Sequence, residues 1–338
     1  MPLIIPATQT LAAGGYDIDN SCRFDRASSA YMSISSLSGG STTTGTQSWW
    51  FKRAGLSTDQ RMWAGYDGSA SARNQIGWQA ADKLYIQLDG DTIRISTQVF
   101  RDVSAWYHIV CAWDTTQGSA SDRLHVYLNG TEITTWDTNA TIGSSADIRA
   151  NNDKILIGQR ETSSLYFDGY LAEFHSVDGT QLDADDFGES GDYGEWKPIA
   201  YSGSYGTNGF YLDFADAADL GDDESGNGRD FTETNLAASD QMTDTPTNNF
   251  AVINPVDGQP DSGYDVLAEG NLSFTNTRNY YSSMNRATFG MSSGKWYWEV
   301  LRADSPGEQG VTLGILPASA SDSRSVTIGG SQIPGGIG

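Results

Sequence analysis

The sequence predicts an all-β protein. Short apolar runs alternate with clusters of Ser, Thr, Asn and Gly, and the 338 residues include 38 Gly, 10 Trp and 16 Tyr. This composition is typical of short strands joined by many turns. No long run has the 3.6-residue period of an amphipathic helix, and we expect only one short helical turn, between Leu182 and Glu189.

The clearest strand pattern lies in the middle of the chain. Leu124, Val126 and Leu128 alternate with polar side chains, which predicts a half-buried strand with these three residues facing the core. The dipeptide Asn129-Gly130 follows and predicts a two-residue hairpin, because both residues tolerate positive φ. The preceding run, 105–114, is apolar on both faces, so we expect a central strand that is covered on both sides.

Two further strand pairs follow from the same reasoning. Leu84, Ile86 and Leu88 share one face, and the turn residues 89–91 precede a returning run at 92–96. This pattern predicts a second hairpin. A third strand after Asn129-Gly130 is expected near residues 132–136.

These patterns resemble the laminin-G-like, concanavalin-A-like jelly roll. The motifs that carry the resemblance are W-Y-H-I-V-C-A-W-D (106–114), R-L-H-V-Y-L-N-G-T (123–131), Q-S-W-W-F-K-R (47–53), I-L-I-G (155–158) and F-D-G-Y-L-A-E-F (167–174). The resemblance covers residues 15–190 and implies a sandwich of two β-sheets. It does not choose a function, since this fold serves lectins, adhesion modules and hydrolases alike.

A second resemblance begins at residue 263. The segments G-K-W-Y-W-E-V (294–300) and G-V-T-L-G-I (310–315) resemble the opening strands of a SPRY domain, another β-sandwich. The later strands of that family have no counterpart, so we expect an incomplete SPRY-like sandwich and a chain that is a fragment of a longer polypeptide. The expected organisation is an N-terminal arm (1–14), the jelly roll (15–190), an aromatic-rich connector that hugs the domains (191–262) and the SPRY-like part (263–338).

Charge and residue usage exclude several classes of partner. The formal net charge is −23, and such a chain is repelled by phosphate backbones, so we expect no nucleic-acid partner. No apolar stretch approaches the roughly 18 residues of a membrane span, which predicts no membrane insertion. The N-terminus lacks the basic and apolar regions of a signal peptide. Cys22 and Cys111 lie in apolar runs and are expected to be buried free thiols rather than a disulfide.

Three aromatic residues are candidates for binding carbohydrate. Trp63, Tyr66 and Trp78 lie in a Gly- and Ser-rich segment, and we expect their rings to be exposed there. Aromatic rings of this kind stack on pyranose faces. The alternative for all three is ordinary packing in the core.

The segment D-D-E-S-G-N-G-R-D (222–230) is a weak calcium candidate. Asp223, Asn227 and Asp230 would supply oxygen ligands, although the spacing of an EF-hand loop is missing. A tight turn is the alternative, and otherwise we expect no metal or cofactor. We also expect no catalytic residues, because Glu173 and Asp178 do not have the spacing of a glycosidase carboxylate pair.

The order of the jelly roll, connector and SPRY-like part resembles bacteriophage virion proteins, especially tail or head fibres. The resemblance implies a structural or adhesion protein located on the virion, which is extracellular after assembly in the host cytoplasm. Its partners would be other virion proteins, further copies of itself in a homo-oligomer, and a host-surface glycan bound without catalysis. The alternatives are a cellular carbohydrate-binding or adhesion module and a polysaccharide depolymerase.

Overall fold

The computed structural model describes residues 15–66, 73–90, 92–148, 153–160, 164–259, 265–276, 284–301 and 314–315. The chain divides into two compact units, Met1–Phe250 and Ala251–Gly338. The expected N-terminal arm, 1–14, lies outside the described residues.

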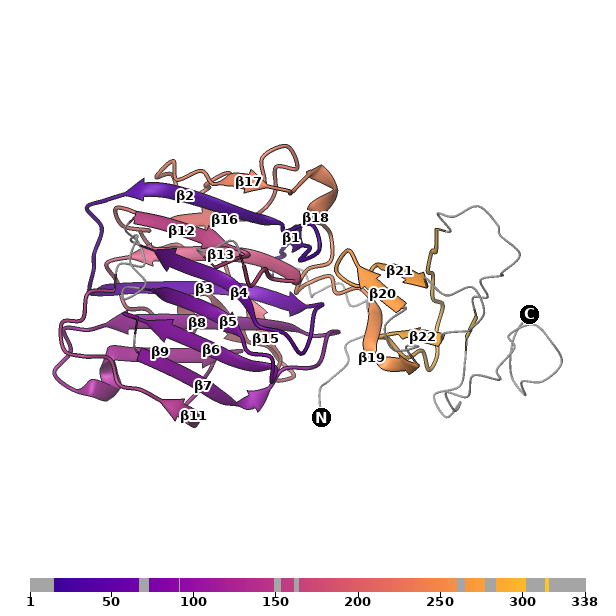
Figure 1. The fold of residues 1–338 in the computed structure, drawn as a ribbon, viewed down its shortest axis with the longest axis horizontal. Helices are drawn as coiled ribbons and strands as arrows, with labels where there is room; N and C mark the ends of the chain where they lie inside the picture. The colour runs from indigo at the N-terminus through magenta and orange to yellow at the C-terminus, as the bar shows by residue number, and fades with distance from the viewer. Residues whose placement is uncertain are drawn as a thin grey trace. The chain divides into compact units, whose positions relative to one another are not determined.

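Two antiparallel sheets form the first unit and lie one behind the other as a sandwich (Figure 1). In spatial order, the described strands of the first sheet are β10 (Thr131–Glu132), β9 (Leu124–Leu128), β8 (Trp106–Asp114), β3 (Thr44–Arg53), β13 (Gly169–Asp178), β1 (Ser21–Phe24) and β18 (Gln241–Met242), with β16 (Phe210–Leu212) also paired to β13. Those of the second sheet are β11 (Trp136–Asn139), β7 (Thr92–Val99), β6 (Lys83–Leu88), β5 (Asn74–Trp78), β4 (Gln60–Tyr66), β12 (Asp153–Ile157), β2 (Tyr31–Leu37) and β17 (Thr232–Thr234). The predicted all-β sandwich is confirmed.

Short elements complete the first unit. They are the hairpin β14 (Gly188–Ser190) and β15 (Trp196–Pro198) and the 3-10 turns η2 (Ala120–Arg123), η3 (Ala184–Asp186) and η4 (Ala238–Asp240). The turn η3 confirms the short helical turn expected between Leu182 and Glu189. Within the described part of the chain, no helix has the length and apolar character needed to span a membrane.

The strand faces follow the predicted alternation. Leu124 and Val126 are 2% and 0% exposed in the core between the sheets, and Asn129 and Gly130 turn the chain with φ values of 47° and 75°. The central strand β8 is buried on both faces, since a second apolar cluster covers Val110 on the side away from the other sheet. Cys22 and Cys111 are buried free thiols, as expected.

Residues 191–250, which the sequence suggests as a connector, contribute three strands to the sandwich. The strands β16, β17 and β18 pair with β13, β2 and β1. The segment 243–250, which we call the strap, is held by buried Lys52. The Lys52 Nζ donates to Asp244 Oδ2 at 2.7 Å, to Asn249 Oδ1 at 2.8 Å and to the Phe250 carbonyl at 2.7 Å. A buried ammonium group needs such acceptors, so the strap and the sheet stabilise each other.

The second unit contains two described antiparallel strand pairs. One pairs β19 (Ile253–Gln259) with β22 (Met284–Ala287), and the other pairs β20 (Asp265–Ala268) with β21 (Ser273–Asn276). Residues 295–300 were expected as a strand, but they have no regular secondary structure, and Trp298 is 50% exposed. The described residues therefore do not show a SPRY-like sandwich, and residues 310–313 lie outside them.

Gln47 is a polar residue on the apolar side of β3. It is fully buried on the face of Trp49 and Phe51, and neither its Nε2 nor its Oε1 has a hydrogen-bond partner among the described residues. An unsatisfied buried polar group costs about 1–3 kcal/mol. We expect Gln47→Met to raise the free energy of unfolding by about 1–2 kcal/mol, measured by urea denaturation.

The matched control is Gln60, whose Nε2 donates to the Gly55 carbonyl at 3.1 Å and to Thr58 Oγ1 at 3.0 Å. Gln60→Met should lower the stability, because it removes these two hydrogen bonds and also the acceptor of the Asp168 N–H, which donates to Gln60 Oε1 at 3.2 Å. A loss of stability in Gln47→Met as well would show that the Gln47 amide has a partner in solution.

Candidate functional site

Two of the three aromatic candidates lie in the core. Trp63 in β4 and Trp78 in β5 are both 0% exposed, whereas Tyr66 at the end of β4 is half-buried. The expected exposure of the two tryptophans is wrong, because β4 and β5 are inner strands whose apolar side chains face the other sheet. No sugar can stack on either indole while the sandwich is closed.

The calcium candidates lie together in one hydrogen-bonded turn. Asp223 Oδ1 accepts the N–H groups of Tyr211 and Ser225, both at 2.9 Å, and Oδ2 accepts the Ser225 hydroxyl at 2.8 Å. Asp230 Oδ1 accepts the Asp223 N–H at 3.2 Å, and the Asn227 amide donates to nearby carbonyls. These contacts match the tight-turn alternative, in which Asp223 anchors β16. No group of three or more His, Cys, Asp or Glu side chains in the described ranges is placed to hold a metal ion.

Ser48 and His108 form a pair that resembles part of a hydrolytic site. Ser48 Oγ lies 2.8 Å from His108 Nε2, and the Trp196 indole donates to His108 Nδ1 at 3.0 Å. Burial lowers the pKa of His108 to about 3, so the imidazole is neutral. An indole N–H is only a donor, so Nδ1 is the acceptor and Nε2–H donates to the serine. A serine that receives this proton donor is not activated as a nucleophile.

Glu173 occupies a strained position in β13. Its φ is 49°, and the pairing of β13 with β3 shifts register between Ala172 and His175, which marks a β-bulge. Its Oε1 accepts the Tyr211 hydroxyl at 2.8 Å, and its Oε2 accepts the Tyr16 hydroxyl at 2.8 Å. Both carboxylate oxygens are thus engaged by tyrosines, which ties the segments around Tyr16 and Tyr211 to the sheet.

A cavity of about 280 Å³ lies near one edge of the sandwich, where residues of β10, the edge strand of the first sheet, and of β7, the neighbour of the edge strand β11 in the second sheet, contribute to its lining. Its volume is near the lower limit of small-molecule sites, about 300 Å³. We call it the rim pocket, and its lining residues are Thr97, Gln98, Leu128, Thr131, Glu132, Ile133, Thr134 and Thr135.

Local hydrogen bonds build the rim pocket. The hairpin at Asn129-Gly130 returns Thr131 and Glu132 along β9. The Ile133 N–H then donates to the Val126 carbonyl at 2.8 Å, and the Trp136 indole donates to the Ile133 carbonyl at 3.0 Å. These bonds hold residues 133–135 as an irregular segment before β11, so the third strand expected near 132–136 is divided between β10 and β11.

The lining of the rim pocket combines hydroxyl and amide groups with apolar surface. Four threonines and Gln98 offer hydroxyl and amide groups, and Leu128 and Ile133 offer apolar surface. Glu132 Oε1 lies 2.6 Å from His125 Nδ1, while its Oε2 has no hydrogen-bond partner in the described part of the chain. Apolar walls with a few convergent polar groups are typical of small-molecule sites. The sequence did not predict this site, because the run T-E-I-T-T after Asn129-Gly130 is not a recognisable motif.

Comparison with known proteins assigns the fold family. Residues 26–186 match the Concanavalin A-like lectin/glucanases superfamily. No curated protein matches the chain in sequence. Among solved structures, a putative carbohydrate-binding protein from Bacteroides ovatus has 14% identity and a TM-score of 0.42, with 65% of this chain and 61% of that chain covered. A heptameric SAP-like pentraxin from Limulus polyphemus has 14% identity and a TM-score of 0.36, with 50% and 80% covered.

Domains LG4-5 of the mouse laminin α1 chain are similar at 12% identity and a TM-score of 0.35, with 57% of this chain and 48% of that chain covered. The family match ends before residue 263, so it does not extend to the part expected to be SPRY-like. Together with the two-sheet architecture, the match shows that residues 26–186 form a concanavalin A-like, laminin G-type jelly-roll domain.

Proposed function

We propose that this chain is a non-catalytic carbohydrate-binding module and that it binds a sugar in the rim pocket. The observation that carries the proposal is the lining of that pocket, where threonine, glutamine and glutamate groups surround Leu128 and Ile133. A sugar has C–H faces and hydroxyl edges, so it matches a wall of this mixed character. The superfamily of the jelly roll includes lectins, which supports the same reading.

Three features support the absence of catalysis. The Ser48–His108 pair has the wrong tautomer for nucleophile activation, and both oxygens of Glu173 accept tyrosine hydroxyls. Glu132, the carboxylate of the pocket, has no second Asp or Glu beside it in the lining. Glycoside hydrolysis normally requires two carboxyl groups that flank one bond.

Substitutions in the pocket should weaken binding. We expect Gln98→Ala and Thr131→Val each to reduce the affinity for a glycan about three- to tenfold, because each removes a hydrogen bond worth about 1 kcal/mol. The ligand is chosen on a glycan array and measured by isothermal titration calorimetry. Thr207→Val is the control, since Thr207 is exposed and lies outside the pocket.

Two outcomes would contradict this proposal. Equal affinity of both pocket variants and the unchanged chain would place the sugar elsewhere. Cleavage of the glycan by the purified chain would refute the non-catalytic part.

A narrower version places the module on a bacteriophage virion. It is supported by the resemblance of the sequence around the connector to fibre-type virion proteins. In this version the chain assembles with itself and with other virion proteins, and repeated weak sites combine on a host-surface glycan with an avidity gain of roughly 10² to 10⁴. Electron microscopy of assemblies that contain the chain tests it. If the chain is a monomer that does not join virion particles, the virion role is contradicted and the alternative, a cellular carbohydrate-binding module, is favoured.

A further inference from the structure

Glu132 belongs to two surfaces at once. It lines the rim pocket, and it also pairs in register with Tyr127 of β9. Its Oε1 lies 2.6 Å from His125 Nδ1, so the carboxylate touches a residue that is not part of the pocket lining. The Glu132 side chain therefore connects the pocket lining to His125.

His125 and Tyr127 form a pair of rings on the outer face of the first sheet. They alternate with Leu124 and Val126, which are buried between the sheets, so both rings lie on the opposite face of the strand, where Tyr127 packs against the apolar cluster around Val110. Their centroids are 6.3 Å apart with an angle of 25° between the planes, and both side chains are half-buried. Aromatic surface of this kind is suited to contact the C–H face of a second sugar ring.

The charges around these rings are negative. Burial raises the pKa of Tyr127, and the carboxylates of Glu132, Asp183 and Asp185 raise it further. The buried cation Arg94 also interacts electrostatically with Glu132; it is 9% exposed, and its guanidinium lies 5.5 Å from the Trp136 ring. Sugar hydroxyls can donate to carboxylates, whereas an acidic sugar placed near them is repelled.

We propose that the rim pocket and the His125–Tyr127 rings are two subsites of one binding site, which takes an uncharged oligosaccharide of at least two sugar units. One unit occupies the pocket and the next lies on the rings, so that the ligand passes over Glu132. The free Oε2 of Glu132 accepts a ligand hydroxyl at the junction. This inference rests on the proposed function, because it extends the same site.

The test compares affinities for short and long sugars. Neutral hexoses, pentoses and N-acetylhexosamines are titrated alongside their oligosaccharides of two to four units, with uronate-containing oligosaccharides as the charged comparison. We expect the unchanged chain to bind the best oligosaccharide at least about fivefold more tightly than its monosaccharide, the gain typical of one aromatic contact. Tyr127→Leu keeps apolar packing but removes the ring, and it should reduce this ratio to near one.

The control is Tyr193→Leu, because Tyr193 is 81% exposed and lies outside both subsites. It should leave the ratio unchanged, and thermal unfolding confirms that both variants are folded. The inference would be overturned if Tyr127→Leu kept the same ratio of oligosaccharide to monosaccharide affinity. It would also be overturned if uronate oligosaccharides bound as tightly as neutral ones. Either result would leave the proposed function in place. Absence of binding to every monosaccharide and oligosaccharide would instead overturn the proposed function.

Discussion

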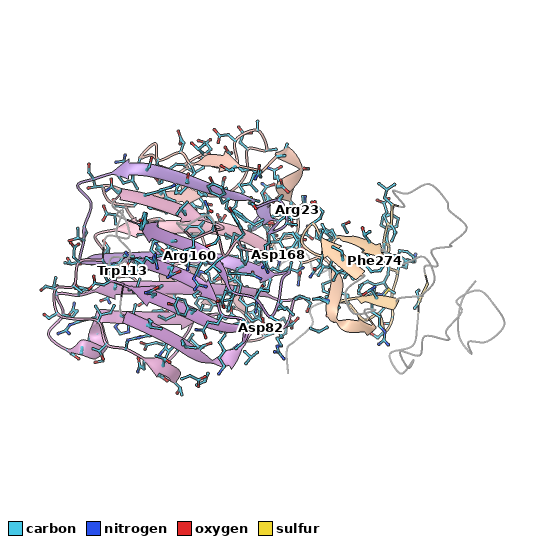
Figure 2. The ribbon with its side chains drawn as sticks, viewed as in Figure 1. Arg23, Asp82, Trp113, Arg160, Asp168 and Phe274 are labelled. Carbon is cyan, nitrogen blue, oxygen red and sulfur yellow. The ribbon has the colours of Figure 1, made fainter. Side chains whose placement is uncertain are left out.

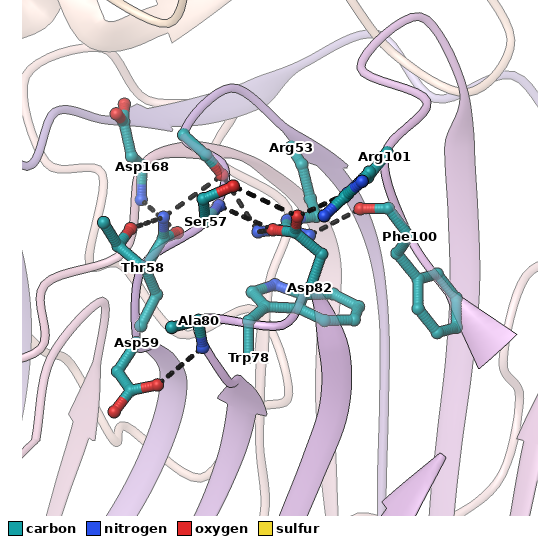
Figure 3. Close-up of polar contacts among 12 residues, drawn as sticks. Arg53, Ser57, Thr58, Asp59, Trp78, Ala80, Asp82, Phe100, Arg101 and Asp168 are labelled. Atoms are coloured by element: carbon teal, nitrogen blue, oxygen red, sulfur yellow. Dashed lines mark hydrogen bonds and ion pairs between the residues drawn. The ribbon is translucent and has the colours of Figure 1, made fainter. Parts of the chain in front are cut away.

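Asp82→Asn is expected to destabilise the jelly roll by about 3–5 kcal/mol, because it removes the charge partner of a buried arginine. Asp82 and Arg53 are both 0% exposed, and Arg53 Nη2 lies 3.0 Å from Asp82 Oδ1. Asp82 also accepts the Ser57 N–H at 2.7 Å and the Arg101 Nε–H at 2.8 Å, as Figure 3 shows. Asparagine can replace some of these hydrogen bonds, but it leaves the Arg53 guanidinium without its counter-charge in the interior.

Urea denaturation of the unchanged chain and the variant measures this loss. Asp137→Asn is the matched control, because it breaks the ion pair with Lys83 at a site where the Asp137 side chain is 43% exposed. Exposed pairs contribute about 0–1 kcal/mol, so the control should be nearly as stable as the unchanged chain. A comparable small effect for Asp82→Asn would mean that water reaches Arg53 and replaces the carboxylate.

Asp168 should make the stability fall as the pH rises from about 4 to about 7. Burial and, to a smaller extent, the neighbouring Asp25 carboxylate raise the pKa of this carboxyl from 3.8 to about 7. Arg26 and Arg53 act in the opposite direction. The Asp25 carboxylate is held in position near Asp168, because its oxygens accept the N–H groups of Ala27 and Ser28 at 3.0 and 3.1 Å.

The sign follows from proton binding. Between the two pKa values the folded chain holds a proton on Asp168 that the unfolded chain has released, so the folded state is progressively disfavoured as the pH rises. A shift of about three pH units corresponds to at most about 4 kcal/mol. Asp168→Asn should remove this dependence and be the more stable protein at pH 8.

Thermal unfolding from pH 4 to pH 8 tests this expectation. Asp192→Asn serves as the control, because Asp192 is exposed, and it should leave the pH profile as it is. If the unfolding temperatures of the unchanged chain and Asp168→Asn depend on pH in the same way, the raised pKa of Asp168 is contradicted. Asp82 and Asp168 both lie at the end of the sandwich opposite Trp113, so the two experiments probe the same end of the fold (Figure 2).

The strand patterns could be predicted because alternation records which face is buried. Leu124 and Val126 turned inward as expected, and the hairpin at Asn129-Gly130 formed with positive φ. The burial of Trp63 and Trp78 could not be predicted from the sequence pattern. Their Gly- and Ser-rich surroundings suggested loops, but burial depends on which strands pair with β4 and β5, and local composition does not contain that information.

The rim pocket was beyond prediction for a similar reason. Thr97 and Gln98 come from β7, whereas Thr131 and Glu132 come from β10 in the other sheet. The packing of the two sheets brings them together, and neither segment carries a recognisable motif. The sequence did not predict the contacts of Lys52 either, because Asp244 and Phe250 are distant from W-F-K-R in the chain.

The strands β16, β17 and β18 also determine where a recombinant version of this domain can end. A piece that stopped at residue 190 would match the family boundaries but would lack the partners of β13, β2 and β1. Unpaired N–H and C=O groups along such strands are templates for pairing with another chain, so this shortened protein is expected to aggregate. Its Lys52 would also lose all three acceptors in the strap. The smallest piece that keeps these three strands and the strap therefore extends to Phe250.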